Sequence, residues 1–276
     1  MGGFARRMSY WNAFAKKYPG RPFLKLDGGS LFSNGLAESP IMNRWMLEGT
    51  YKSNLDAINL SAWDVPVWQE LADMATAGRI PAQWLRQPLV SANLRPKVSN
   101  FPAVRRYVIL TVPLVAKGRK IVRVGITGLL FDPEQRVSRT DFDVTDPDQA
   151  AEETIKELRD KTDYRVILSD LPIGKAISLA VKVPGISMIL VSHDYAVASE
   201  AEQIGDTLVT IAVNESRMLS EIRVGVALAE SKFNVQTRHV PLDQSIPDDP
   251  AMAALQDKAI AEINEFRRNL KLEPAR

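Results

Sequence analysis

The sequence predicts an α/β fold in which helices pack on mixed β-sheets. Apolar segments of strand length alternate with segments of helix length, and a hairpin signal interrupts this alternation near the middle of the chain. Elements in such an order pack as layers, because each one has an apolar face to bury. The 276 residues contain no convincing linker or internal repeat, so we expect one continuous layered core.

The first third of the chain alternates helices with short strands. Pro19 and Gly20 end the first helix, and the Gly28-Gly29 pair turns the chain after the first strand. Helices are expected at 5–17, 38–51 and 67–76, and strands at 22–26, 57–60 and 89–92.

The remainder opens with a hairpin and closes with a long helix. Lys117-Gly118 predicts the hairpin turn, and Asp146 before Pro147 predicts an N-cap followed by proline at the first helical position. Strands are expected at 107–115, 120–127, 164–169, 186–191, 207–212 and 220–228, the last two paired with each other. Helices are expected at 147–161, 174–181 and 250–270, with long loops at 131–145 and 236–249.

Composition excludes several classes of function. The 35 basic and 33 acidic side chains nearly cancel, so we expect no nucleic-acid partner, and the basic, aromatic N-terminal stretch is interpreted as an amphipathic helix. The absence of cysteine excludes disulfides, thiolate metal sites and a cysteine nucleophile. No apolar run approaches the roughly 18 residues of a membrane span, and the N-terminus has no apolar core of a signal peptide.

Polar residues follow the expected strands, where open α/β sheets place their sites. The carboxyl ends in question are Asp27–Ser30, Asn59–Asp64, Ser91–Leu94, Ser169–Leu171 and Ser192–Tyr195. A serine hydrolase is not expected, because no G-x-S-x-G elbow occurs and no serine is spaced to pair with His193.

Segments of this chain resemble the calcineurin-like metallophosphoesterases, in particular the catalytic domain of 5′-nucleotidases and UDP-sugar hydrolases. Family patterns such as GGLARRAT, LSANL and VPGIDLILGGHSH have counterparts here in the same order. The matching segments are 2–9, 24–30, 56–64, 90–94, 123–129, 166–172 and 183–195. The resemblance covers about residues 2 to 228 and implies a four-layer α/β/β/α sandwich with mixed sheets.

The family's catalytic centre holds two divalent metal ions, and most of its ligand positions are changed here. The resemblance places the bridging aspartate on Ser30, the asparagine ligand on Leu60 and the transition-state histidine on Ser61. A further ligand histidine falls on Asp170, and the final histidine pair falls on the positions of His193 and Tyr195. The family's first motif, an Asp-x-His on the opening strand, has no counterpart within the numbered residues.

We therefore expect a degenerate site with no cofactor. One imidazole and one carboxylate do not hold two dications, since the bridging carboxylate that offsets their repulsion is missing. His193 is interpreted as a relic of the metal site, and His193 with Asp170 and Asp194 as a possible mononuclear site for one manganese, zinc or iron ion. Asp27 and Asp64 could add carboxylates, or could serve as turn and cap residues.

These expectations favour a catalytically inactive domain, residues 1–230, that acts as a structural or binding subunit of a larger assembly. Residues 231–276, a polar loop and a C-terminal helix, are expected to pack on this domain or on a partner. A metal-dependent nucleotidase with an altered site, and a domain that holds a nucleotide or phosphate without cleaving it, remain alternatives. Export to the periplasm would follow from family analogy alone.

The missing first strand has a physical consequence. A sheet that lacks a central strand exposes unpaired backbone groups and apolar surface. We expect this gap to be covered by an upstream segment or by a partner protein.

Overall fold

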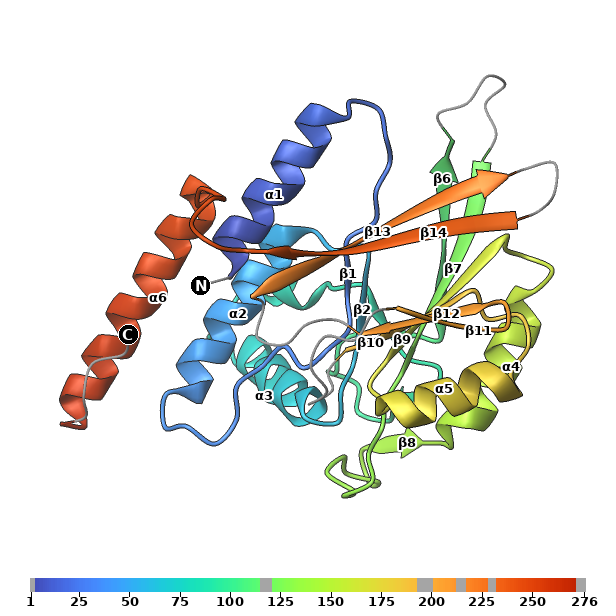
Figure 1. The fold of residues 1–276 in the computed structure, drawn as a ribbon. Coiled ribbons are helices and arrows are strands. Elements are labelled where there is room, and N and C mark those ends of the chain that lie inside the picture. The colour runs from blue at the N-terminus through green and yellow to red at the C-terminus, as the bar shows by residue number, and fades with distance from the viewer. Residues whose placement is uncertain (1–2, 115–120, 193–200, 212–216, 228–231, 272–276) are drawn as a thin grey trace.

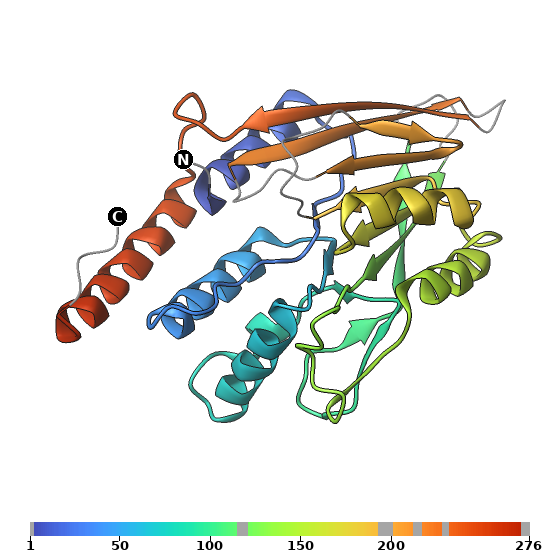
Figure 2. The ribbon, with the colours of Figure 1, turned by 60° about the horizontal axis from the view of Figure 1, so that its bottom comes forward.

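The computed structural model describes residues 3–114, 121–192, 201–211, 217–227 and 232–271. These residues form two β-sheets that face each other, with helices on both outer sides (Figures 1 and 2). The expected four-layer α/β/β/α sandwich is therefore confirmed.

The first sheet has four parallel strands in the order β1-β2-β3-β5. Its strands are short, because each carries only a few apolar residues before a polar turn: β1 (Leu26–Asp27), β2 (Ala57–Asn59), β3 (Leu89–Val90) and β5 (Val104–Arg105). β1 lies at one end of this sheet and pairs only with β2 among the described strands.

The second sheet has six strands in the order β11-β12-β10-β9-β7-β6. Its central strands read as continuous apolar runs, as expected for strands that are buried on both faces. The bounds are β6 (Tyr107–Pro113), β7 (Ile121–Leu129), β9 (Tyr164–Ser169), β10 (Met188–Val191), β11 (Glu202–Ile204) and β12 (Thr207–Ile211).

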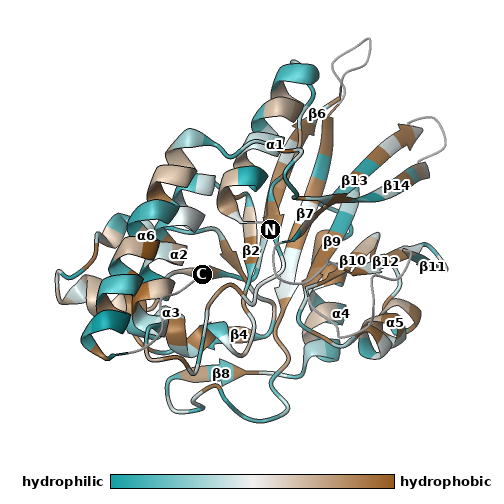
Figure 3. Ribbon diagram, turned by 60° about the vertical axis from the view of Figure 1, so that its left-hand side comes forward, coloured by the Kyte–Doolittle hydropathy of each residue, from teal (hydrophilic) through white to brown (hydrophobic). Residues whose placement is uncertain are grey.

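Helices cover the two outer faces. The first sheet carries α1 (Phe4–Lys17), α2 (Ser39–Ser53), α3 (Asp64–Thr76) and the short 3₁₀ helix η1 (Ala82–Leu85), and the second carries α4 (Pro147–Leu158) and α5 (Ile173–Lys182). Separate apolar clusters fill the two helix–sheet interfaces, and a third lies between the sheets. Figure 3 shows apolar strands inside and polar outer helix faces.

The C-terminal helix α6 (Pro250–Asn269) packs against α1 and α2. The Glu262 carboxylate accepts a hydrogen bond from the Trp45 indole at 2.8 Å and pairs with Arg44. Asp249 caps the helix by accepting the N–H groups of Ala251 and Met252 at 3.1 Å. This helix therefore packs on the domain itself.

A long hairpin packs on the apolar cluster between the sheets and corrects one predicted pairing. β13 (Met218–Ala227) pairs antiparallel with β14 (Lys232–Pro241), whereas β13 was expected to pair with the strand at 207–212. That strand, β12, instead lies parallel to β10 inside the second sheet. The loop expected at 236–249 was also wrong up to residue 241, because β14 occupies that part.

Most other predicted elements are confirmed with small shifts of their ends. β6 and β7 pair antiparallel as expected, whereas the turn predicted at Lys117-Gly118 lies outside the described residues. The Asp146 cap on α4 also forms as expected, with its carboxylate 2.9 Å from the Gln149 N–H. β4 (Leu94–Pro96) and β8 (Phe142–Val144) form a small extra sheet, and β8 lies within the loop expected at 131–145. The strand expected at 22–26 is reduced to β1, since residues 22–25 pair with no strand in the part of the chain that the structure describes.

Candidate functional site

The carboxyl ends of strands from both sheets meet at one place. Asn59, at the end of β2, donates hydrogen bonds from its side-chain amide to the carbonyl oxygens of Gly28 and Leu129, each at 3.1 Å. Gly28 also lies against Ser192, where an added Cβ would stand 2.6 Å from the Ser192 Cβ. Backbone approaches this close require the glycine and bring the ends of β1, β2, β7 and β10 together.

Asp64 is the fully buried carboxylate at the centre of this junction. Its two oxygens accept the backbone N–H groups of Ser30 at 2.6 Å and Phe32 at 3.1 Å, and its own N–H donates to the Ser61 hydroxyl at 3.2 Å. Burial raises the pKa of Asp64 to about 6, and the donated N–H groups partly offset that rise. Asp64 thus holds the loop after β1 onto the start of α3.

Asp170 performs a similar task at the end of β9. Its Oδ2 accepts the backbone N–H groups of Ala62 and Phe131, each at 3.2 Å. Burial raises the pKa of Asp170 to about 8, and the neighbouring charges of Asp64 and Asp132 raise it further. Two buried carboxyl groups therefore fasten the loops of this junction by hydrogen bonds to main-chain N–H groups.

The described residues at the positions that the resemblance assigns to the family's site, Ser30, Leu60 and Ser61, lie at or beside this junction. Ser30 is exposed and has a left-handed backbone, with φ of 59°. Leu60 is fully buried in the apolar cluster of the first sheet, and Ser61 is fully buried at the start of α3. His193 and Tyr195, with Asp194, lie outside the described residues.

The described residues do not fit a two-metal centre. Leu60 offers no donor atom, both Asp64 oxygens already accept main-chain N–H groups, and Oδ2 of Asp170 accepts two more. In the part of the chain that the structure describes, no group of three or more histidine, aspartate or glutamate side chains could hold a metal ion. We therefore assign no catalytic step to a metal here.

Sequence reasoning underestimated two residues of this junction. Asp64 was weighed only as a spare carboxylate or cap, and Asn59 was not singled out, although both lie in the matched segment 56–64. Their roles depend on contacts with residues 28–32 and 129, which are distant in sequence. Only the closure of the two sheets brings these groups together.

Comparison with known proteins supports the resemblance. No protein-family profile matches the chain. An uncharacterized metallophosphoesterase of Bacillus subtilis, YunD, is 23% identical over 206 residues, which are 75% of this chain and 41% of that protein.

Solved structures of the same class superpose over nearly the whole chain. Sulfate thiohydrolase SoxB of Thermus thermophilus has a TM-score of 0.74 at 16% identity, covering 95% of this chain and 47% of that one. A 5′-nucleotidase precursor of the same species has a TM-score of 0.73 at 20% identity, with 95% and 53% covered. The calcineurin-like phosphoesterase YfkN of Bacillus subtilis has a TM-score of 0.72 at 17% identity, with 97% and 91% covered.

The chain has the calcineurin-like metallophosphoesterase fold, in the form seen in 5′-nucleotidase catalytic domains. It spans less than half of YunD and about half of the SoxB and 5′-nucleotidase chains. Among the described residues, no helix is long and apolar enough to cross a membrane.

Proposed function

We propose that this domain is a catalytically inactive member of the 5′-nucleotidase-like group and serves as a binding or structural subunit of a larger protein assembly. The observation that carries the proposal is the residue types at three positions: Ser30 and Leu60 stand where the resemblance places metal ligands, and Ser61 stands where it places the transition-state histidine. Hard divalent ions need several oxygen or nitrogen ligands, and Ser30 and Leu60 supply too few.

The two buried carboxyl groups support the same reading. A metal-binding carboxylate must be ionised and must turn its oxygens toward the ion. Asp64 and Asp170 instead accept main-chain N–H groups, and burial raises the pKa of each. They stabilise the loops in a way that needs no ion.

Metal content and hydrolysis test the proposal together. The purified chain would be incubated with manganese, zinc or iron, desalted, and measured by elemental mass spectrometry. Hydrolysis of p-nitrophenyl phosphate, AMP and a UDP-sugar would then be followed beside an active 5′-nucleotidase as the positive control. We expect less than one metal equivalent and no hydrolysis above the buffer blank.

Two results would overturn the proposal. Metal-dependent hydrolysis that disappears in His193→Ala would establish an altered but working phosphoesterase. Two bound metal equivalents would show that the ligand positions have been wrongly matched.

A further inference from the structure

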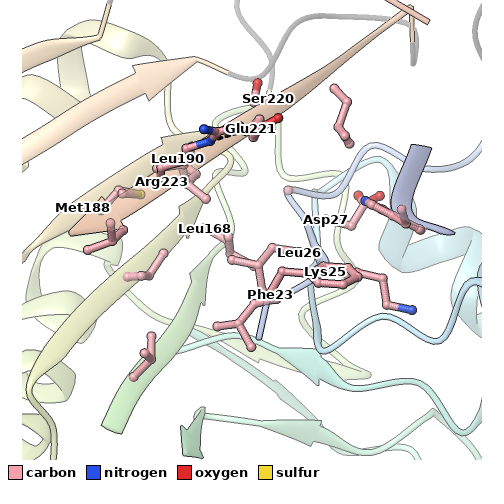
Figure 4. A pocket seen from close by; sticks show the side chains of 18 of the residues that line it. Phe23, Lys25, Leu26, Asp27, Leu168, Met188, Leu190, Ser220, Glu221 and Arg223 are labelled. Atoms are coloured by element: carbon pink, nitrogen blue, oxygen red, sulfur yellow. Dashed lines mark hydrogen bonds and ion pairs between the residues drawn. The ribbon is translucent and has the colours of Figure 1, made fainter. Parts of the chain in front are cut away.

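The loop that follows β1, residues 28–38, connects two features of the molecule. Its first part, residues 28–31, lines a largely apolar groove of about 720 Å³ between the two sheets. Figure 4 shows side chains of β1 on one wall of this groove and side chains of β9 and β10 on another. The N–H groups of Ser30 and Phe32 bind the Asp64 carboxylate, so the loop also belongs to the junction of strand ends.

The loop contains the sequence Asn34-Gly35, and no other asparagine of the chain precedes a glycine. Both residues are exposed and lie outside helices and strands. Gly35 has a φ of 84°, and no atom lies within 4 Å of the Cβ that another residue would have there. Because glycine has no side chain to obstruct an approach, its main-chain nitrogen is open to the Cγ atom of the preceding asparagine.

The loop is held firmly on both sides of Asn34 but only weakly at Asn34 itself. The Asn43 side chain accepts the Ser33 N–H at 2.8 Å and donates to the Ser33 carbonyl oxygen at 2.9 Å. Further along, the Leu36 N–H donates to the Ser39 hydroxyl at 3.2 Å.

The Asn34 side-chain amide donates a long hydrogen bond, at 3.3 Å, to the Trp63 carbonyl oxygen. This bond is exposed to water and exceeds the usual N–H···O distance, so it contributes little to holding the side chain in place. Rotation of the Asn34 side chain toward the Gly35 nitrogen is therefore inexpensive.

We propose that Asn34 is a site of spontaneous deamidation, and that the product loosens the loop beside the junction. The Gly35 main-chain nitrogen loses its proton to water or hydroxide and forms a bond to the Asn34 Cγ atom. The bond from Cγ to the side-chain nitrogen breaks, and that nitrogen takes up a proton and leaves as ammonia. Water then opens the cyclic imide at either carbonyl carbon, which gives aspartate or isoaspartate. The reaction consumes one water molecule and needs no oxidant or cofactor.

Either product changes the contacts of the loop. A carboxylate has no proton to donate, so the hydrogen bond to the Trp63 carbonyl oxygen is lost. Isoaspartate also inserts a methylene group into the main chain between the anchors at Ser33 and Leu36. Trp63 directly precedes Asp64, and Ser33 directly follows Phe32, so the change lies next to both partners of the hydrogen bond from Phe32 to Asp64.

Other asparagines of the chain provide internal controls. Asn54 is exposed at the end of α2 and has a φ of 48°, but the bulky Leu55 follows it. Asn59 and Asn93 are buried, and their side chains donate to main-chain carbonyl oxygens at 3.1 Å and 2.8 Å. We expect these three side chains to keep their amide groups while Asn34 loses its own.

Peptide mapping by mass spectrometry tests the modification. The purified chain is kept at mildly alkaline or mildly acidic pH, samples are digested at acidic pH, and isoaspartate is detected by enzymatic methylation of its carboxyl group. We expect Asn34 to convert at least about tenfold faster than Asn54, and faster at alkaline pH because the Gly35 nitrogen must lose its proton. An intact Asn34, or conversion no faster than at Asn54, would overturn the proposal.

A matched variant tests the effect on the loop. Asn34→Gln keeps an amide group but requires a larger ring for the same attack, so its residue 34 should stay unmodified and the aged variant should gain no negative charge there. Hydrogen exchange of the Ser30 and Phe32 amides should become about tenfold faster in the aged parent and should not change in the aged variant. Unchanged exchange in a fully deamidated parent would overturn the loosening of the loop. These outcomes do not depend on metal content or hydrolysis, so they are independent of the proposed function.

Discussion

The Asp64 carboxylate accepts the backbone N–H of Ser30 at 2.6 Å, so a side chain at the start of α3 holds the loop that follows β1. Ser30 occupies the left-handed region with φ of 59°, a conformation that needs support in a residue with a side chain. The position that the resemblance assigns to a bridging metal ligand is therefore kept in place by a hydrogen bond.

Removal of this carboxylate should destabilise the domain. Asp64→Ala leaves the N–H groups of Ser30 and Phe32 without acceptors, and we expect a loss of about 2–4 kcal/mol in the free energy of unfolding. Urea denaturation followed by circular dichroism measures the change. Asp248→Ala is the control, because its ion pair with Arg6 is at the surface and should contribute less than about 1 kcal/mol. Equal losses in both variants would show that Asp64 has no special role.

The free energy of unfolding should fall as pH rises from about 4 to about 8, because the pKa of Asp170 is raised in the folded protein. Its pKa is about 8 in the folded protein, above the usual value of 3.8, so the folded state binds more protons than the unfolded state between these values. The contribution of Asp170 to stability is then fully present below about pH 4 and is lost as pH rises through about 8. Asp170→Asn keeps an oxygen for the Ala62 and Phe131 N–H groups, and the free energy of unfolding should then vary less with pH over this window. Denaturation in the presence of EDTA at several pH values measures both slopes, and identical slopes would contradict the prediction.

The two sheets approach each other closely at Gly128. An added Cβ at this position would stand 2.2 Å from the Asn59 Oδ1 and 2.3 Å from the Val90 carbonyl oxygen, so Gly128→Ala forces the sheets apart. We expect a loss of about 3 kcal/mol, seen as a lower melting temperature in calorimetry. Gly174→Ala in α5 is the matched control, because no atom lies within 4 Å of its added Cβ, and it should melt no lower than the parent.

Removal of only one partner of the Arg7–Asp27 ion pair should lower the free energy of unfolding. Arg7 stacks near the rings of Phe4 and Trp11, and its side chain is only 13% exposed. Asp27→Ala leaves a buried cation without its partner, so we expect a loss of about 3 kcal/mol. The double variant Arg7→Met with Asp27→Leu removes both charges and should be more stable than Asp27→Ala. Chemical denaturation ranks the two variants, and the reverse order would show that the pair is effectively solvated.

Local sequence signals located most elements of the fold. The strand expected at 164–169 coincides with β9, and Asp146-Pro147 and Asp249-Pro250 begin α4 and α6 as predicted. These signals are local, because a cap or a short apolar run acts through residues within one turn of itself. Strand pairing is not local, and the pairing of 207–212 with 220–228 was therefore misjudged.

β14 was not predicted as a strand, although part of its sequence has the alternation of one. Phe233 and Val235 alternate with polar residues, which is the period of a half-buried strand, yet the many polar residues of 236–241 favoured a loop. The strand forms because β13 supplies a partner along its full length. Its apolar face then packs on the cluster between the sheets, where the Phe233 ring lies 4.8 Å from the ring of Tyr164.

The sequence by itself determined the α/β class, the caps and the residue types at Ser30, Leu60 and Ser61, since these depend on residue type and on near neighbours. The tertiary structure alone decided that Asp64 and Asp170 hold main-chain N–H groups, that Arg7 is buried against Asp27, and that a groove opens beside β1. Each of these depends on segments distant in the chain that meet only when the two sheets close. Burial then raises the pKa of both carboxyl groups, an effect that no short stretch of sequence could reveal.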